Sequence, residues 1–178
     1  MPRILALFIE GGLLVCGLWV LFFLSTLLHE MGHALGYRIA TGSRYWHVRV
    51  GSGKRLLITR WLTVKLLPFD GRFTPAEKNK IDTTAKRILV LAGGPAVSLA
   101  VTALLLLIKL GGVPLHSGFL AEDALEFFVS SALSVNLFIL ILSLSPIHYF
   151  HGEIKGMETD GLQIVHAIRN RRGKAQGA

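Results

Sequence analysis

Three long apolar runs without a charged residue constrain the fold of this chain more than any other feature. They cover residues 11–28, 88–108 and 127–147, which are 18, 21 and 21 residues long. A helix needs roughly 17–25 apolar residues to cross a bilayer, because each residue advances it by only about 1.5 Å. Only 17% of the residues are charged, against roughly 25% in an ordinary soluble domain. The sequence therefore predicts a single membrane α-helical domain over residues 1–178, with spans at about 11–39, 87–110 and 125–147.

The first apolar run has one alternative interpretation. Because Arg3 precedes it, the run can also be read as a secretory signal peptide. Such a peptide has a shorter apolar region and is followed by small residues at its cleavage site, whereas "HEMGH" follows here directly. We therefore interpret the run as a transmembrane helix that continues through this motif.

The charges between the runs predict the orientation of the chain. Residues 41–87 contain eleven Lys and Arg against three Asp and Glu, and more cations follow the third run. The connection between the second and third runs is instead acidic. Cytoplasmic loops carry the excess of Lys and Arg, so we expect residues 41–87 and the C-terminus in the cytoplasm and the N-terminus outside. The net charge of +8 then follows from topology and from attraction to anionic lipids, without nucleic acid as a partner.

The segment between the first two spans changes character. Its stretches "RYWHVRV" and "RLLITRWLTVKLL" alternate and are rich in β-branched and aromatic residues, and "GSGK" between them is typical of a turn. We predict a small cytoplasmic β-hairpin or sheet at about residues 44–71. A basic amphipathic surface lying on lipid headgroups is an alternative, and both can hold. Further along, "TPAE" at 74–77 is typical of a helix start, and an amphipathic helix is expected at about 161–170.

The motif that carries chemistry is "HEMGH", at the end of the first run. Residues four apart on a helix share one face, about 6 Å apart along its axis, so His29 and His33 can offer two imidazoles to one metal ion. Glu30 points about 100° away and can face a metal-bound water. This H-E-x-x-H pattern indicates two zinc ligands and a general base. Two helix-end histidines bonded to loop carbonyls are the structural alternative, but ionisable groups are costly in a bilayer without a function.

A catalytic zinc also needs a third protein ligand and one open position. Because the predicted topology puts "HEMGH" at the cytoplasmic level, the third ligand should follow the third span. The segment "SPIHYFHGEIKGMETDG" offers five candidates there, which are His148, His151, Glu153, Glu158 and Asp160. The residues alone leave the choice open. A site with three histidines is chemically reasonable, and Asp160 can instead cap the helix that follows it.

Three segments of the chain resemble the signatures of the site-2 protease family of intramembrane zinc metalloproteases. They are "LLHEMGHALG", "LAGGPAVSLAV" and "SPIHYF…METDG", which occur in the family's order, one per span, and cover nearly the whole chain. The resemblance implies one Zn²⁺ per chain, held by His29, His33 and Asp160, with Glu30 as the general base. It also implies that the site is lined by Gly94, Pro95, Ser98, Ser143 and Pro146.

The chain departs from the family pattern at a few positions. Ser98 and Ser143 stand where the family has Asn, which removes amide donors that would hold a substrate strand. The spacing from Pro146 to Asp160 is longer than in the common form. No insertion is long enough for the PDZ domain that some relatives carry, so the resemblance is to a minimal three-span core.

The resemblance implies an intramembrane zinc metalloendopeptidase that acts near the cytoplasmic face of a prokaryotic plasma membrane. It would hydrolyse a peptide bond in or near a transmembrane segment of a membrane-protein substrate, as in regulated intramembrane proteolysis. The lipid bilayer is the other expected partner, and the sequence predicts no oligomeric state. The alternative is a non-catalytic membrane adaptor of the same fold. A metal transporter is a third candidate, but it would need ionisable groups at mid-depth on several spans.

Overall fold

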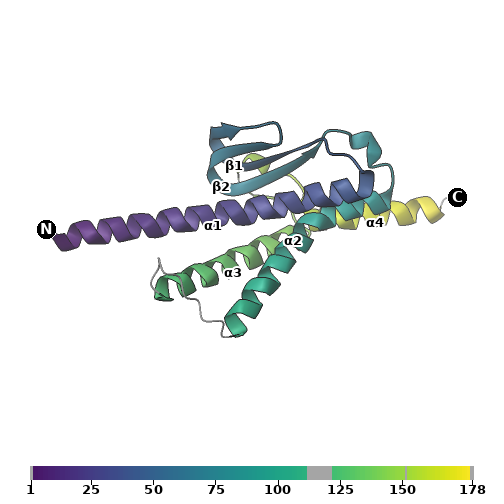
Figure 1. Ribbon diagram of the computed structural model, residues 1–178. Helices are drawn as coiled ribbons and strands as arrows, with labels where there is room; N and C mark the ends of the chain where they lie inside the picture. Colours follow the sequence, from purple (N-terminus) through teal and green to yellow (C-terminus); the bar gives the residue numbers. More distant parts are fainter. Residues whose placement is uncertain (1, 112–121, 151, 177–178) are drawn as a thin grey trace.

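The computed structural model describes residues 2–111, 122–150 and 152–176 (Figure 1). Among these residues, three helices are long and apolar enough to cross a membrane. They are α1 (Pro2–Thr41), α2 (Thr84–Leu110) and α3 (Glu122–Leu144). A small two-stranded antiparallel sheet lies between α1 and α2 in the chain, and α4 (Asp160–Gln176) follows α3. The predicted membrane α-helical fold with a small sheet after the first span is therefore confirmed.

The helices differ from the predicted spans at their ends. α1 is a single helix that carries the whole "HEMGH" motif, and its membrane candidate part is Gly11–Thr41. α3 begins earlier than the predicted 125–147. It also ends earlier, because Pro146 disfavours a helical conformation at Ser145. α4 is longer than the predicted 161–170. Each difference is a shift of a boundary and leaves the number of spans unchanged.

α1 and α2 cross where two glycines meet. A Cβ atom added to Gly32 would lie 2.8 Å from the carbonyl carbon of Gly93, and one added to Gly93 would lie 2.9 Å from that of Gly32. The two backbones are therefore in direct contact, which small residues allow in membrane helices. Since Gly32 belongs to the "HEMGH" motif, this crossing holds α2 directly against the motif.

The sheet consists of β1 (Trp46–Ile58) and β2 (Leu62–Pro75). The turn that joins them is Thr59–Trp61, and "GSGK" lies inside β1, so the predicted turn position is wrong. The glycines of "GSGK" have φ angles of 90° and 79°, a conformation that glycine adopts without strain and that bends the strand. Val48 is aligned with both Phe73 and Leu62. The first half of β1 therefore lies between the two ends of β2.

The predicted helix start at "TPAE" is also wrong. Thr74 and Pro75 are the last residues of β2 and pair with the start of β1. A short 3-10 helix, η1 (Lys78–Lys80), follows, and α2 begins only after Thr83, whose side chain accepts a hydrogen bond from the backbone N–H of Lys86. Pairing across the sheet thus overrides the local capping pattern.

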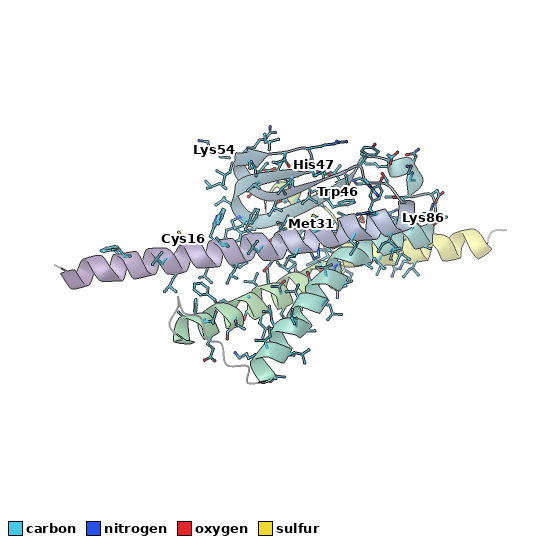
Figure 2. The ribbon with its side chains drawn as sticks, viewed as in Figure 1. Cys16, Met31, Trp46, His47, Lys54 and Lys86 are labelled. Atoms are coloured by element: carbon cyan, nitrogen blue, oxygen red, sulfur yellow. The ribbon has the colours of Figure 1, made fainter. Side chains whose placement is uncertain are left out.

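The sheet lies along one side of α1, and α2 and α3 lie along the other (Figure 1). Lys54 is at the side of the sheet far from α1 (Figure 2). On the near side, the indole N–H of Trp19 donates to the Leu66 carbonyl at 2.8 Å, and the rings of Phe22 and Phe69 meet edge to face at 5.3 Å. Trp19 and Phe22 belong to the apolar, membrane-candidate part of α1. One end of the hairpin therefore lies beside the apolar part of α1.

Candidate metal centre

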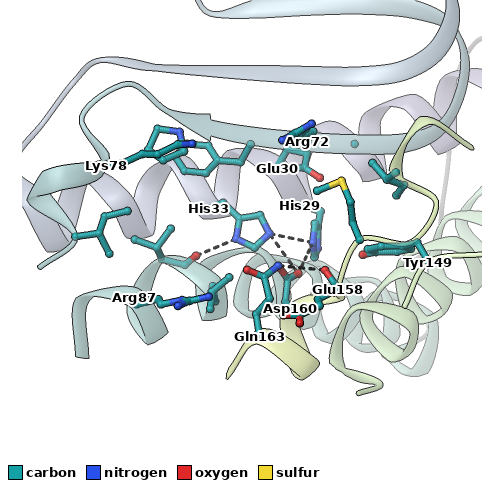
Figure 3. A pocket seen from close by; sticks show the side chains of 18 residues that line it. His29, Glu30, His33, Arg72, Lys78, Arg87, Tyr149, Glu158, Asp160 and Gln163 are labelled. Carbon is teal, nitrogen blue, oxygen red and sulfur yellow. Dashed lines mark hydrogen bonds and ion pairs between the residues drawn. The ribbon is translucent and has the colours of Figure 1, made fainter. Parts of the chain in front are cut away.

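Three buried side chains from distant parts of the chain meet at one point (Figure 3). His29 and His33 come from α1, and Asp160 is the first residue of α4. Three ligand atoms, the two histidine Nε2 atoms and Oδ2 of Asp160, lie 3.3 Å from one another. Among the described residues, these three are the group of His, Cys, Asp or Glu side chains that can hold a metal ion.

The dimensions of this triangle fit zinc. In a tetrahedron the distance between two ligands is about 1.6 times the metal–ligand distance, so edges of 3.3 Å correspond to metal–ligand distances of about 2.0 Å. Zinc binds imidazole nitrogen at about 2.0–2.1 Å and carboxylate oxygen at about 2.0–2.2 Å. Three protein ligands leave the fourth tetrahedral position open, which is the arrangement of catalytic zinc sites. Donor types, spacing and ligand number therefore agree with a zinc site.

Hydrogen bonds from α2 orient both imidazoles. Nδ1 of His29 lies 2.9 Å from the hydroxyl of Ser98, and Nδ1 of His33 lies 2.9 Å from the carbonyl of Val90. When each Nδ1 carries the ring proton and donates it to these oxygens, each Nε2 keeps a lone pair for a metal. The sequence placed Ser98 among the residues that line the site. In the structure this fully buried serine lies behind His29 and positions it.

The backbone of α2 passes close to the triangle. A Cβ atom added to Gly94 would lie 2.7 Å from Nε2 of His29 and closer still to Nε2 of His33. Only glycine therefore leaves room for both rings at this position. Pro95 follows inside the helix, where it has no N–H for the carbonyl of Leu91 and bends the helix. Pro95 itself is buried and is not among the described residues that line the cavity.

Asp160 is available to the site because Thr159 caps α4 in its place. The Thr159 hydroxyl accepts the N–H of Leu162 at 3.4 Å and donates to the carbonyl of Ile147 at 3.0 Å. The fully buried side chain of Thr159 thus links the segment that follows α3 to the first turn of α4. The alternative that Asp160 serves only as the helix cap is wrong for this structure.

The carboxylate of Asp160 is ionised at neutral pH. Burial raises its pKa, but the hydrogen bonds that the Nε2 atoms of His29 and His33 donate when protonated outweigh burial and lower the pKa to about 2. A metal ion would take the place of those Nε2 protons. A metal ligand must be deprotonated, so this carboxylate is ready to bind a cation without losing a proton first.

Glu30 lies beside the triangle without belonging to it. The side chain is buried and lines the same cavity as the three ligands. It faces β2, since a Cβ atom added to Gly71 would lie 2.8 Å from Cγ of Glu30. Figure 3 shows the carboxyl group between β2 and His29. This position suits a proton acceptor for a molecule held at the open vertex.

A cavity of about 540 Å³ contains this site. Its walls come from α1, β2, η1, α2, α4 and the segment before α4. The sequence analysis did not select several of the side chains that line it, which are Arg72, Phe73, Lys78, Arg87, Tyr149 and Gln163. These residues share no motif, and the folded chain alone brings them together.

Some of the residues selected from the sequence lie away from the cavity. Ser143 is buried in α3 and Pro146 is exposed, and neither is among the described residues that line the cavity. Of the alternative ligands, His148 is exposed and its backbone pairs with that of Glu158. His151 lies outside the described residues.

Glu153, another alternative ligand, instead holds the segment before α4 against the sheet. Its carboxylate forms ion pairs with Arg49 and, at 2.6 Å, with Lys65. Its backbone N–H donates to Asp70 at 3.0 Å, and Asp70 pairs with Arg49 at 2.8 Å. The next residue, Ile154, lines the cavity. The short helix η2 (Gly152–Ile154) therefore forms part of the cavity wall, and ion pairs with the sheet hold it in place.

Comparison with known proteins gives one match. The family model for Peptidase family M50 matches residues 17–169, a range that contains the three residues of the triangle and Glu30. No curated protein and no solved structure gives a significant match.

Proposed function

Because the chain belongs to Peptidase family M50, the site-2 protease family, we propose that it is an intramembrane zinc metalloendopeptidase. Its substrate is a transmembrane or membrane-adjacent segment of another membrane protein. The observation that carries this proposal is the buried triangle of ligand atoms, with edges of 3.3 Å, in a cavity that also contains Glu30. The fourth tetrahedral position and the cavity together provide space for a peptide group and a water molecule.

In this proposal His29, His33 and Asp160 hold one Zn²⁺, and Glu30 is the general base. Zinc bound there supplies Lewis acidity to a water molecule and to the carbonyl of the scissile peptide. Glu30 accepts a proton from the attacking water and delivers it to the leaving amine. Its role follows from its position, because it shares the cavity with the ligands but contributes no atom to their triangle.

The substrate must be extended at the cleavage site. A transmembrane helix hides its peptide bonds in its own hydrogen bonds, so it has to unwind locally before hydrolysis. β2 runs past the site with Gly71 and Phe73 in the cavity wall, and an extended segment can align with a strand through backbone hydrogen bonds. On another wall, burial raises the pKa of Tyr149, so its hydroxyl stays neutral and can donate a hydrogen bond to the substrate.

We also propose that the N-terminus lies outside a plasma membrane and the C-terminus in the cytoplasm. The support is the excess of eleven cations over three anions in residues 41–87. This segment follows the end of α1 that carries His29 and His33. The metal centre then lies near the cytoplasmic face.

The deciding experiment compares the purified full-length chain with Glu30→Gln. We measure bound zinc by mass spectrometry and cleavage of a single-span substrate in the same membrane mimetic. The wild type should carry one zinc ion and cleave, whereas Glu30→Gln should carry zinc and not cleave. If the wild type holds zinc but cleaves no more than Glu30→Gln, the chain is an adaptor and the peptidase proposal is wrong.

A further inference from the structure

The cavity contains three cations that the proposed hydrolysis does not use. Arg72 comes from β2, Lys78 from η1 and Arg87 from the first turns of α2, and all three line the cavity. Within the part of the chain that the structure describes, none of the three forms an ion pair. No dashed line reaches them in Figure 3 either.

The cations next to them in the sequence are, by contrast, paired. Lys80 lies 3.0 Å from Glu77, and Lys86 lies 2.8 Å from Asp82. The hydrogen bond from Lys86 is the main cause that lowers the pKa of Asp82. Neither Lys80 nor Lys86 is among the described residues that line the cavity. Among these five neighbouring cations, the three that line the cavity have no carboxylate partner among the described residues, and the two that do not line it are paired.

The carboxylates of the cavity do not compensate these charges. Asp160 contacts the two imidazoles, and Glu158 lies 3.1 Å from His166. Glu30 lies against Gly71. A bound zinc ion would add further positive charge. The cavity therefore has an uncompensated positive region.

Two of the three cations, Lys78 and Arg87, lie at one end of the cavity, whereas Arg72 lies near Glu30. Figure 3 shows Lys78 and Arg87 on the same side of the site as His33, and Tyr149 on the opposite side. His33 is closer than the other histidine to the end of α1 at Thr41. In the proposed topology that end of α1 is cytoplasmic, so the positive region faces the cytoplasmic flank of a bound substrate.

We propose that Lys78 and Arg87, assisted by Arg72, bind acidic side chains of the substrate on the cytoplasmic side of the scissile bond. This inference rests on the proposed peptidase function and adds the substrate class. Most transmembrane segments carry Lys and Arg on their cytoplasmic flank, and the positive region repels such a flank. An Asp or Glu flank is attracted, and the arginines can bind a carboxylate through two parallel hydrogen bonds. The cavity thereby selects a minority of membrane segments by charge.

The test uses three single-span substrates that differ only in the cytoplasmic flank, which is rich in Glu, Gln or Lys. Binding is measured on the Glu30→Gln chain in nanodiscs of zwitterionic lipid, and cleavage is measured with the wild type. We expect the Glu flank to bind about tenfold more tightly than the Gln flank, the size typical of two exposed ion pairs. The preference should decrease with added salt, because these charges are exposed.

A matched pair of variants assigns the preference to the cavity. The double variant Lys78→Gln with Arg87→Gln should reduce the Glu-to-Gln ratio to about one. The control, Lys80→Gln with Lys86→Gln, removes the same charge from the same two elements and should keep the ratio. Equal ratios for the three flanks on the starting chain, or equal losses in both double variants, would overturn the inference.

Two further outcomes distinguish this inference from lipid binding by the same cations and from the peptidase proposal. If binding follows the content of anionic lipid in the nanodiscs and not the substrate flank, the cations contact lipid headgroups and the inference is wrong. If the flank preference is present but the wild type cleaves none of the three substrates, charge recognition stands and the peptidase proposal fails.

Discussion

Gly94→Ala should remove the metal without unfolding the protein. The new Cβ atom would lie 2.7 Å from Nε2 of His29, whereas non-bonded heavy atoms pack at about 3.5 Å. At least one imidazole must therefore move by about 0.8 Å or more, several times the roughly 0.2 Å by which zinc–ligand distances vary. Loss of a hydrogen bond behind a ligand already weakens metal binding about 10–100-fold. Displacement of a ligand itself should weaken zinc binding at least about a hundredfold.

The fold should survive this change because the clash is with side chains. An imidazole can rotate away from the new methyl group, and alanine favours the helix by roughly 1 kcal/mol over glycine. Gly93→Ala provides the contrast one residue earlier, since its Cβ would meet the backbone of Gly32. That clash separates two helices and should cost about 1–3 kcal/mol of stability.

The assay measures zinc affinity by competition with a chelating dye, and thermal unfolding of the metal-free proteins. Gly12→Ala is the neutral control, because a Cβ atom there has no neighbour within 4 Å. Gly94→Ala should unfold at the same temperature as the metal-free wild type but bind zinc poorly. Gly93→Ala should unfold at a lower temperature. If Gly94→Ala binds zinc as tightly as Gly12→Ala, the three ligand atoms do not form the metal site described here.

Three more predictions test the site and its orientation. Asp160→Ala should lose zinc and cleavage, while His148→Ala should keep both, and the reverse result in zinc stoichiometry would exclude Asp160 as the third ligand. Ser98→Ala should weaken zinc binding about 10–100-fold by removing the hydrogen-bond partner of His29 Nδ1. Ser98→Thr keeps the hydroxyl and should therefore bind zinc more tightly than Ser98→Ala. Reporter fusions at Gly53 and after Ala178 should both report the cytoplasm, and a periplasmic signal at Gly53 would reverse the proposed topology.

The part of the site that follows from local geometry was predictable from the sequence. His29 and His33 share a helix face because they are four residues apart, and a long apolar run makes that helix certain. The third metal ligand was not predictable from local geometry in this way. Asp160 faces the histidines because the Thr159 hydroxyl caps α4 instead and also bonds to the carbonyl of Ile147. Only the resemblance to a family singled out this aspartate among five candidates.

Contacts between distant segments account for what the sequence did not predict. "GSGK" and "TPAE" carry good local turn and helix signals, yet both belong to strands because pairing between β1 and β2 outweighs them. Lys78 and Arg87 lie on two separate elements, and no spacing in the sequence indicates that both face the metal centre. The cavity is a product of the tertiary structure and has no local pattern.

The ligand triangle takes its members from opposite ends of the chain, and this has a consequence for biosynthesis. Chains fold from the N-terminus onward as they are made, so the two histidines and Glu30 enter the membrane with the first helix. Asp160 leaves the ribosome only after all three membrane helices. A nascent chain therefore lacks one ligand for most of its synthesis. In the proposed peptidase, hydrolysis can therefore begin only after the last helix brings Asp160 to the two histidines.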